Sequence, residues 1–205
     1  MRFIPPTCNH ENSFIVFGIR SKIGNVRHRN VIRETWGNSD AWKRIKNGDP
    51  KTRFDVKLVF IIGLDVIGRH YNIQKENDQF GDILQVEFTE GFYNESLKDH
   101  YFMKYSHQLC PNADYLVKVS DDIFINPKTF WHSWETSIKS ETIALSGCLD
   151  KETPTIRDPR DKKFVPDEWY KGHHSSYYAE GNTKPIKVLS YEDRKISFKS
   201  INPSI

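Results

Sequence analysis

The sequence contains little cysteine. Among its 205 residues are only three cysteines, Cys8, Cys110 and Cys148. Three cysteines cannot build a disulfide-stabilised framework, and their spacing matches no zinc site. They leave open one disulfide with one free thiol, and their number does not indicate a cellular compartment.

Long hydrophobic runs are also missing. The longest purely aliphatic or aromatic run is Leu58–Ile62, whereas a membrane-spanning helix needs about 20 residues. The opening residues, Met1–Pro6, are too short and too soon broken by proline to form a signal peptide. We therefore expect a soluble chain with no membrane span and no targeting segment.

The rest of the composition is that of a globular protein with uneven charge. The hydrophobic content is 37%, the aromatic content 13% and the mean hydropathy −0.66, which is enough for one domain with a core. The net charge is +3, but residues 1–56 carry eleven Lys and Arg against five Asp and Glu. A basic amino-terminal third favours an anionic partner, either a nucleotide or a nucleic acid. No recognisable nucleic-acid-binding module supports the second candidate.

Buried strands alternate with amphipathic helices along most of the chain. The expected strands are 14–19, 57–63, 82–88, 116–119 and 142–147, and the expected helices are 26–36, 73–80, 94–109 and 128–140. Partial alternation in 82–88 indicates an edge strand. In the third helix, an apolar stripe is expected at Leu97, Tyr101, Tyr105 and Leu109. The order of elements predicts an α/β fold, with a mostly parallel sheet covered by helices on both faces.

The chain changes character after Cys148. Residues 150–176 are dense in charge, proline and aromatic residues without a clean period, which is typical of a long surface loop. The tail at 182–205 has only scattered apolar residues and is not predicted to join the core. We expect a single domain over 1–205, with its core at 14–150 and a loop plus a shortened or rearranged carboxyl-terminal part at 151–205.

Two adjacent carboxylates follow the fourth expected strand. Asp121 and Asp122 precede the apolar residues Ile123–Ile125, where two negative charges are costly unless a cation meets them. A hard divalent cation suits such oxygen ligands and usually binds substrate phosphates as well. In open α/β sheets ligands collect at the carboxyl ends of strands, where this pair is expected. The pair predicts a metal–phosphate site; the alternative is a solvated strand-to-turn junction ending at Asn126–Pro127.

Basic residues occur at informative positions in two expected helices. Arg29 and Arg33 are four residues apart and share one helix face, which would suit a diphosphate because guanidinium binds phosphate bidentately. The alternative is an ordinary solvated helix face. Lys98 lies in the first turn of its helix, where a cation opposes the helix dipole. Either an anion bound nearby or an ordinary surface lysine would account for it.

Four sequence blocks occur in an informative order. They are RNVIRETW at 29–36, FIIG at 60–63, GDILQ at 81–85 with YNESLK at 93–98, and CPNA at 110–113 with Lys118 and DDIFIN at 121–126. Each block is weak alone, but together, ordered over residues 14–147, they are specific. On these blocks the chain resembles the beta-1,3-galactosyltransferase family (glycosyltransferase family 31), which also contains beta-1,3-N-acetylglucosaminyltransferases.

The resemblance implies a fold and a reaction. This family is similar to other GT-A glycosyltransferases, in which a Rossmann-like sheet binds a UDP-sugar together with a manganese ion. The implied reaction is transfer of a hexose, galactose or N-acetylglucosamine, from a UDP-sugar to a glycan or glycoprotein acceptor. The linkage would be beta-1,3, formed with inversion, in the Golgi. Residues 14–150 would then be the nucleotide-sugar-binding core.

The resemblance also implies roles for individual residues. Asp122 matches the last aspartate of the family's triple-aspartate motif and would ligate the metal. Asp121 would contact the ribose or metal-bound waters. Arg29, Arg33 and Lys98 would line the donor site. The metal would bridge the two phosphates and take up charge as UDP leaves.

The chain departs from the family pattern in two places. Ser120 stands at the first position of the aspartate motif, so weaker metal binding and lower donor affinity are expected. The family's catalytic base lies in a Glu-Asp-Val block, of which Glu192–Asp193 resembles a remnant. Asp193 is therefore the candidate base that takes the acceptor hydroxyl proton; the alternative is a charged tail pair without a role. With an incomplete acceptor half and no Golgi anchor expected, the chain resembles a shortened member, either active or a UDP-sugar-binding relative without turnover.

Overall fold

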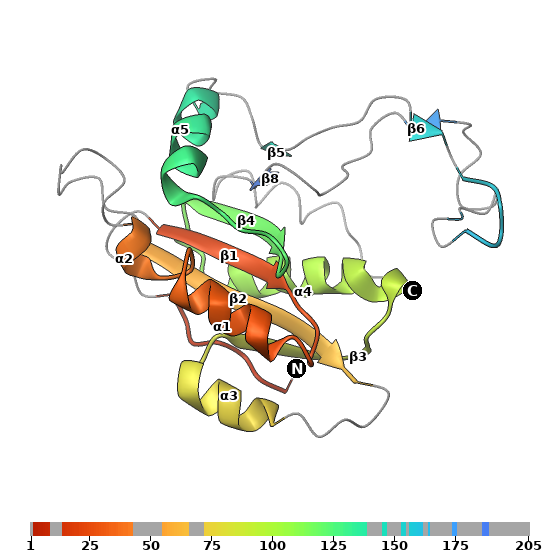
Figure 1. Ribbon diagram of the computed structural model, residues 1–205, viewed down its shortest axis with the longest axis horizontal. Helices are drawn as coiled ribbons and strands as arrows, with labels where there is room; N and C mark the ends of the chain where they lie inside the picture. The colour runs from red at the N-terminus through yellow and green to blue at the C-terminus, as the bar shows by residue number, and fades with distance from the viewer. Residues whose placement is uncertain are drawn as a thin grey trace.

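A parallel sheet lies at the centre of the molecule (Figure 1). The computed structural model describes residues 2–8, 14–42, 55–65, 72–138, 145–146, 153–154, 156–161, 164, 174–175 and 186–188. The parallel strands are β1 (Phe14–Arg20), β2 (Asp55–Leu64), β3 (Ile83–Thr89) and β4 (Tyr115–Ser120). They lie in the order β3-β2-β1-β4, and each neighbouring pair is parallel. These strands confirm the four predicted between residues 14 and 120.

Short antiparallel strands extend this sheet beyond β4. Strand β8 (Ile186–Val188) pairs with β4, and β5 (Leu145–Ser146) pairs with β8, which makes a six-stranded sheet. A separate two-stranded sheet joins β6 (Thr153–Pro154) to β7 (His174–Ser175). The expectation that the tail at 182–205 stays outside the core is wrong for β8, because its three residues pair with the central strand β4.

Helices cover both faces of the sheet, as predicted (Figure 1). One face carries α1 (Val26–Glu34), α2 (Ser39–Trp42) and α5 (Pro127–Ile138), with α3 (Ile73–Phe80) towards β3; the other carries α4 (Glu95–Leu109), which follows a short 3-10 turn, η2 (Phe92–Asn94). Strand β1 is buried along nearly its whole length, as expected of a strand covered on both sides. The result is an α/β fold consistent with a GT-A-like glycosyltransferase domain.

Strand β3 lies at one end of the sheet, which confirms the prediction of an edge strand. The amino-terminal segment partly covers this edge through a bridge between Phe3 and Gln85. The Arg2 amide donates to the Gln85 carbonyl at 2.9 Å, and the Gln85 amide donates to the Phe3 carbonyl at 3.1 Å. Covering an edge in this way protects its backbone groups from pairing with another chain.

An aromatic cluster fills the core beneath α1, α2 and α5. Phe17 of β1 has ring-centroid distances of 5.4 Å to Trp36, 5.2 Å to Trp42 and 6.1 Å to Phe130. The Trp42 indole is fully buried and donates to the Trp36 carbonyl at 2.6 Å. Helix α2 was not expected, because the polar residues that follow Trp36 carry no helical period. The burial of Trp42 against this cluster supplies the missing stabilisation.

The apolar stripe predicted for α4 is confirmed at Tyr105, which is buried, and at Tyr101 and Leu109, which pack partly buried against the core, but it is wrong at Leu97. Lys98, Phe102, Tyr105 and Ser106 are the buried residues of this helix, whereas Leu97 is 37% exposed. Phe102 lies outside the predicted stripe, and Gly18 of β1 leaves room for its ring. A Cβ atom at residue 18 would lie only 2.5 Å from that ring, so Phe102 faces the sheet.

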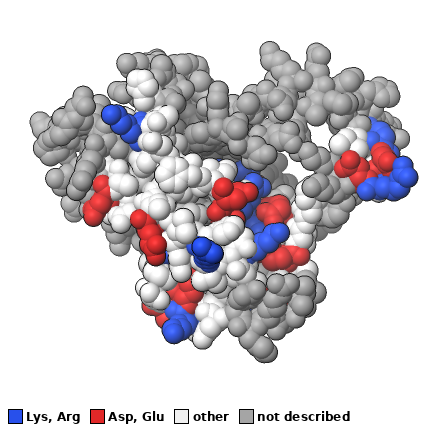
Figure 2. Space-filling model, viewed as in Figure 1, with Lys and Arg blue, Asp and Glu red and all other residues white. Residues whose placement is uncertain are grey.

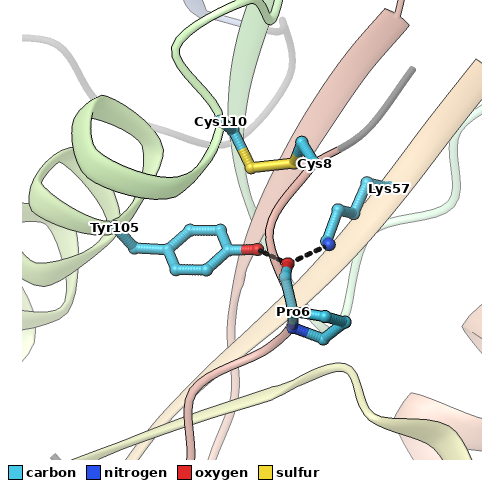
Figure 3. The surroundings of a disulfide bond; sticks show 5 residues. All are labelled: Pro6, Cys8, Lys57, Tyr105 and Cys110. Atoms are coloured by element: carbon cyan, nitrogen blue, oxygen red, sulfur yellow. Dashed lines mark hydrogen bonds between the residues drawn. A yellow bond between two sulfur atoms is a disulfide. The ribbon is translucent and has the colours of Figure 1, made fainter.

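A disulfide bond fastens the amino-terminal segment to the end of α4 (Figure 3). Cys8 pairs with Cys110, which decides the question that three cysteines left open for these two. Beside it, the Tyr105 hydroxyl donates to the Pro6 carbonyl at 3.0 Å, and the Lys57 ammonium donates to the same oxygen from the other side. Burial raises the pKa of Tyr105 and lowers the pKa of Lys57.

Among the helices of the described residues, none has the length and apolarity that a bilayer crossing needs.

Candidate functional site

The two carboxylates lie where the ends of β1 and β4 meet. These strands are parallel neighbours, and Arg20 pairs with Ser120 in their register. Ser21 and Asp121 therefore leave the sheet side by side, and the Asp121 amide donates to the Arg20 carbonyl at 3.1 Å. The sequence predicts this location, because ligand sites of open α/β sheets lie at the carboxyl ends of strands.

Asp121 is held by the segment that follows β1. Its side chain is 10% exposed. Its Oδ2 atom accepts hydrogen bonds from the Ser21 hydroxyl at 2.6 Å and from the Asn25 amide at 2.8 Å. Its Oδ1 atom lies 3.7 Å from Nδ1 of His28, a half-exposed residue. One carboxylate oxygen is thus fixed by the fold, while the other lies towards the more open side.

Asp122 is exposed and borders a cavity of about 410 Å³. Asp121 borders the same cavity together with the basic side chains of Arg27 and His28. The apolar part of its wall includes Trp36 and Phe124. Carboxylates, cations and aromatic groups therefore meet at one opening beside the ends of β1 and β4.

Arg29 lies inside the protein instead of on a solvated helix face. Its side chain is fully buried. Its Nε and Nη2 atoms donate to the two carboxylate oxygens of Glu76 at 2.8 and 2.7 Å. Nη1 donates to the Lys22 carbonyl at 2.6 Å and to the Ser21 hydroxyl at 3.0 Å. The guanidinium thus binds α3 on one side and the segment after β1 on the other.

Arg33 is bound by two carboxylates of this chain. Its Nε and Nη2 atoms donate to Asp82 at 2.8 and 2.7 Å, and Nη2 also reaches Glu76 at 2.9 Å. Burial alone would lower the pKa of Arg33, but the hydrogen bonds and charges of Asp82 and then Glu76 outweigh it and raise that pKa. Burial would likewise raise the pKa of Glu76, and the two arginines outweigh it and lower that pKa. The guanidinium also stacks 4.0 Å from the ring centroid of Phe80.

Lys98 is buried, not a surface lysine. Its side chain is 1% exposed, and its ammonium donates to the Ser21 carbonyl at 2.9 Å. Two carboxylates surround the same group, Glu90 at 2.8 Å and Glu95 at 3.1 Å. Because its charge is matched within the protein, no bound anion is needed to explain its place in the first turn of α4.

The structure separates the predicted site residues into two groups. Asp121 and Asp122 border the cavity. The described side chains lining that cavity do not include Arg29, Arg33 or Lys98. Arg29 and Lys98 instead bind the backbone carbonyls of the segment that follows β1. Direct contact between these three cations and a donor therefore stays a prediction. Asp193, the candidate base, lies outside the described residues.

Sequence reasoning missed several residues at this edge. Ser21 and Asn25 hold Asp121, while Arg27 and His28 border the cavity. None of the sequence patterns described above singles out Ser21 or Asn25. The register between β1 and β4, which decides what lies opposite Asp121, cannot be read from the sequence.

Arg20 is another residue that the sequence did not single out. Its Nη2 atom donates to the Ser120 hydroxyl at 3.1 Å, at the position where the family motif carries an aspartate. Its Nε atom is buried and has no hydrogen-bond partner in the part of the chain that the structure describes. An arginine with this donor unsatisfied lies directly beside the aspartate pair.

The donor set suits a hard cation only when a ligand completes it. No group of three or more His, Cys, Asp or Glu side chains that could hold a metal is found within the described ranges. Cations such as magnesium are commonly held by one or two carboxylates, with waters and substrate phosphates completing the shell. Asp121 and Asp122 fit that arrangement, in which metal and phosphorylated ligand bind together.

The charges around this edge are mixed in sign. Figure 2 shows acidic and basic side chains interspersed over the described part of the face that carries α1. A continuous basic surface, which is the usual footprint of a nucleic-acid-binding protein, is not seen on this face of the described residues.

Comparison with known proteins assigns the chain to a family. A family model described as Galactosyltransferase matches residues 27–185. The chain belongs to this family. It is 31% identical to human N-acetyllactosaminide beta-1,3-N-acetylglucosaminyltransferase 4 over 183 residues. This alignment covers 86% of this chain and 44% of the relative. The resemblance drawn from the four sequence blocks is confirmed.

Other relatives carry related names. Lactosylceramide 1,3-N-acetyl-beta-D-glucosaminyltransferase B of Xenopus laevis is 28% identical over 180 residues, covering 85% of this chain and 46% of the relative. Mouse beta-1,3-galactosyltransferase 2 is 24% identical over 181 residues, covering 86% of this chain and 41% of the relative. The chain spans about half the length of the curated relatives it matches.

Proposed function

We propose that this protein is an inverting hexosyltransferase that binds a UDP-sugar at the Asp121–Asp122 edge. It transfers galactose or N-acetylglucosamine to a glycan acceptor, including glycans on proteins, in a beta-1,3 linkage. The observation that carries the proposal is the aspartate pair at the ends of β1 and β4, beside a cavity, in a chain of the Galactosyltransferase family. The names of the relatives supply the reaction class and the linkage.

The aspartate pair has two tasks in this proposal. Asp122, exposed at the cavity, is the metal ligand, and Asp121 uses its less occupied Oδ1 atom towards the ribose or a metal-bound water. Manganese, when bound with the donor, supplies positive charge that the leaving UDP needs. The exposed Arg27 and His28 line the same cavity and are available to an anionic donor.

The buried cations contribute to the donor site indirectly. Arg29 and Lys98 hold Lys22 and Ser21 through backbone carbonyls, and Arg33 holds Glu76, the partner of Arg29. Their charges are already matched by carboxylates of the chain. They therefore shape the donor site while other groups bind the phosphates. Asp193 remains the candidate base for the acceptor hydroxyl.

A second candidate function is UDP-sugar binding without turnover. It is favoured by Ser120, which supplies a hydroxyl hydrogen-bonded to Arg20 where the family motif has a carboxylate. A serine at this position leaves fewer anionic ligands for the metal. Incubation with UDP-galactose or UDP-N-acetylglucosamine and simple galactosides separates the two functions, because release of UDP with glycan product requires turnover.

Calorimetric titration with UDP, in the presence and absence of manganese, tests the donor site. We expect binding that strengthens with manganese and loses this enhancement in Asp122→Asn. Asp78→Asn is the matched control, because Asp78 is also an exposed carboxylate but lies on α3. Absence of manganese-dependent binding in the unmodified chain would refute the proposal, and equal behaviour of the two variants would refute the assignment of Asp122.

The disulfide bond supports an oxidising, secretory compartment such as the Golgi. Cys8 and Cys110 are paired, and disulfides persist mainly in proteins that pass through such compartments. Thiol titration of the denatured, unreduced protein tests the pairing. One reactive thiol is expected before reduction and three after it, because the chain has three cysteines. Three reactive thiols before reduction would contradict the pairing.

A further inference from the structure

A chain of hydrogen bonds runs from the protein interior to Asp121. We propose that Ser21 is a positioning residue of the donor site, whose hydroxyl orients Asp121 and couples it to the buried Arg29–Glu76 pair. The consequence for ligand binding rests on the proposed function. The orientation of the Asp121 carboxylate by Ser21 does not, and it can be tested without a ligand.

Ser21 is fixed in place by its own backbone. The residue is 2% exposed and directly follows β1. Its amide donates to the Ile61 carbonyl of β2 at 3.0 Å, and its carbonyl accepts from the Lys98 ammonium of α4 at 2.9 Å. Because its amide and its carbonyl are bound by two different elements, the backbone of Ser21 is fixed. Its hydroxyl therefore stays beside its present neighbours.

The direction of the hydrogen-bond chain follows from what each group can donate. A guanidinium has no acceptor atom, so Arg29 Nη1, at 3.0 Å, must donate to the Ser21 hydroxyl oxygen. The single hydroxyl proton of Ser21 then points at Asp121 Oδ2, 2.6 Å away, because the Lys22 carbonyl, the other acceptor within its reach among the described residues, is at 3.4 Å. A hydroxyl–carboxylate distance of this size is typical of a strong, charge-assisted hydrogen bond.

This series of hydrogen bonds determines which carboxylate oxygen of Asp121 faces the cavity. Oδ2 accepts from both Ser21 and Asn25, so it is occupied by the fold. Oδ1 remains on the side of His28 and of the cavity. A carboxylate held in this way needs no reorientation when a ligand arrives, and such preorganisation strengthens binding.

The other end of this series of hydrogen bonds is held by Glu76 of α3. Glu76 holds Arg29 through both carboxylate oxygens and is itself bound by Arg33. Arg33 in turn donates two hydrogen bonds to Asp82. Arg29 therefore cannot swing away from Ser21 without breaking a buried ion pair. This explains how an arginine with no access to the cavity affects the donor site.

Ser21→Ala and Ser106→Ala form a matched pair for the test. Both remove a hydroxyl from a buried serine, but the Ser106 hydroxyl has no hydrogen-bond partner among the described residues, and Ser106 lies on α4 away from the cavity lining. Ser21→Cys is the second variant, because it preserves the shape of the side chain and carries a much weaker donor. It replaces Ser21→Ala in the comparison if the alanine variant does not fold.

The first measurement is the carbon-13 resonance of the Asp121 carboxylate in the ligand-free protein. We expect it to move in Ser21→Ala and to stay in place in Ser106→Ala. An Asp121 resonance that is the same in Ser21→Ala as in the unmodified protein overturns the positioning role. This outcome does not depend on UDP, so it is distinct from a failure of the proposed function.

The second measurement is UDP affinity with and without manganese. Here Asp121 is taken to act on a metal-bound water, and loss of a residue that orients such an outer-shell partner typically lowers metal affinity by about 10- to 100-fold. We expect a loss of this size for Ser21→Ala only when manganese is present, and no loss for Ser106→Ala. A loss of equal size with and without manganese would show a general structural effect and contradict the proposal.

Discussion

Two clusters of charge include residues of α1, and they differ in what balances their charges. The inner cluster consists of Arg29, Arg33, Glu76 and Asp82, whose charged groups bind one another. The rim cluster consists of Arg27, His28, Asp121 and Asp122, which border the cavity. The inner cluster is complete without a ligand, whereas the rim keeps groups available for one.

Helix α1 supplies the basic residues of both clusters. Arg27 and His28 are exposed at the cavity, while Arg29 is fully buried and Arg33 is 9% exposed. Spacing along one helix therefore separates buried, mutually paired arginines from basic residues exposed at the cavity. Arg29, the more buried of the two inner arginines, binds the segment that follows β1, and Arg33 binds Glu76, the partner of Arg29.

The largest expected effect comes from breaking the inner cluster. Glu76→Gln removes the charge that compensates the fully buried Arg29. Removing one partner of a buried ion pair typically costs about 3–5 kcal/mol of unfolding free energy. Glu34→Gln, an exposed glutamate on α1, should change the unfolding free energy by about 0.5 kcal/mol or less. Urea unfolding of both variants makes the measurement, and a small effect at Glu76 would show that the inner cluster is not a scaffold.

A smaller effect is expected where the charge is kept and only the geometry changes. Arg33→Lys retains a cation but loses the double hydrogen bond to Asp82 and the stacking on Phe80. Because lysine cannot reproduce a planar, bidentate contact, we expect a loss of about 1.5–3 kcal/mol, the range for a hydrogen bond to a charged group. Arg27→Lys at the rim is the control. Equal stability of both variants would mean that bidentate geometry is unimportant here.

Acid should weaken the inner cluster gradually. The pKa of Glu76 is lowered in the folded protein by Arg29 and Arg33, which outweigh burial. Its contribution is present above the unfolded pKa of about 4.3 and is lost as pH falls through the lower folded pKa. The difference in unfolding free energy between the unmodified protein and Glu76→Gln should therefore narrow below about pH 4. A difference that stays constant from pH 7 to pH 3 would contradict the ion pairing.

The smallest effect on stability is expected at the rim. Asp122 is exposed, so Asp122→Asn should change the unfolding free energy by no more than about 0.5 kcal/mol. The same substitution is expected to remove manganese-dependent UDP binding. A large loss of stability in Asp122→Asn would place this residue in the scaffold and remove the distinction between the two clusters.

Local features of the fold follow directly from the sequence. Helix α3 has the predicted bounds, and Gly81 ends it in the left-handed conformation, with φ of 63°. The four parallel strands were visible as apolar runs. The place of Asp121 and Asp122 at a strand end also followed, because it depends only on the position of the apolar run before them.

Features that depend on residues distant in the sequence could not be predicted from it. Arg29 has the spacing of a solvated helix residue, and its burial depends on Glu76, which is 47 residues away. Lys98 has the pattern of a surface residue, and its burial depends on the Ser21 carbonyl, 77 residues away. Phe102 of α4 is buried although it lies outside the predicted stripe, because Gly18 on β1 makes room for its ring. In each case tertiary contacts decide which side of a helix is buried.

Paramagnetic broadening by manganese tests the central claim most directly. In an NMR spectrum of the protein with UDP, substoichiometric Mn²⁺ broadens the amide signals nearest to its binding position. The account predicts selective loss of the Asp121 and Asp122 amide signals, dependent on UDP and absent in Asp122→Asn. Broadening centred on Glu90 and Glu95, or broadening that is the same without UDP, would contradict a donor site at the aspartate pair.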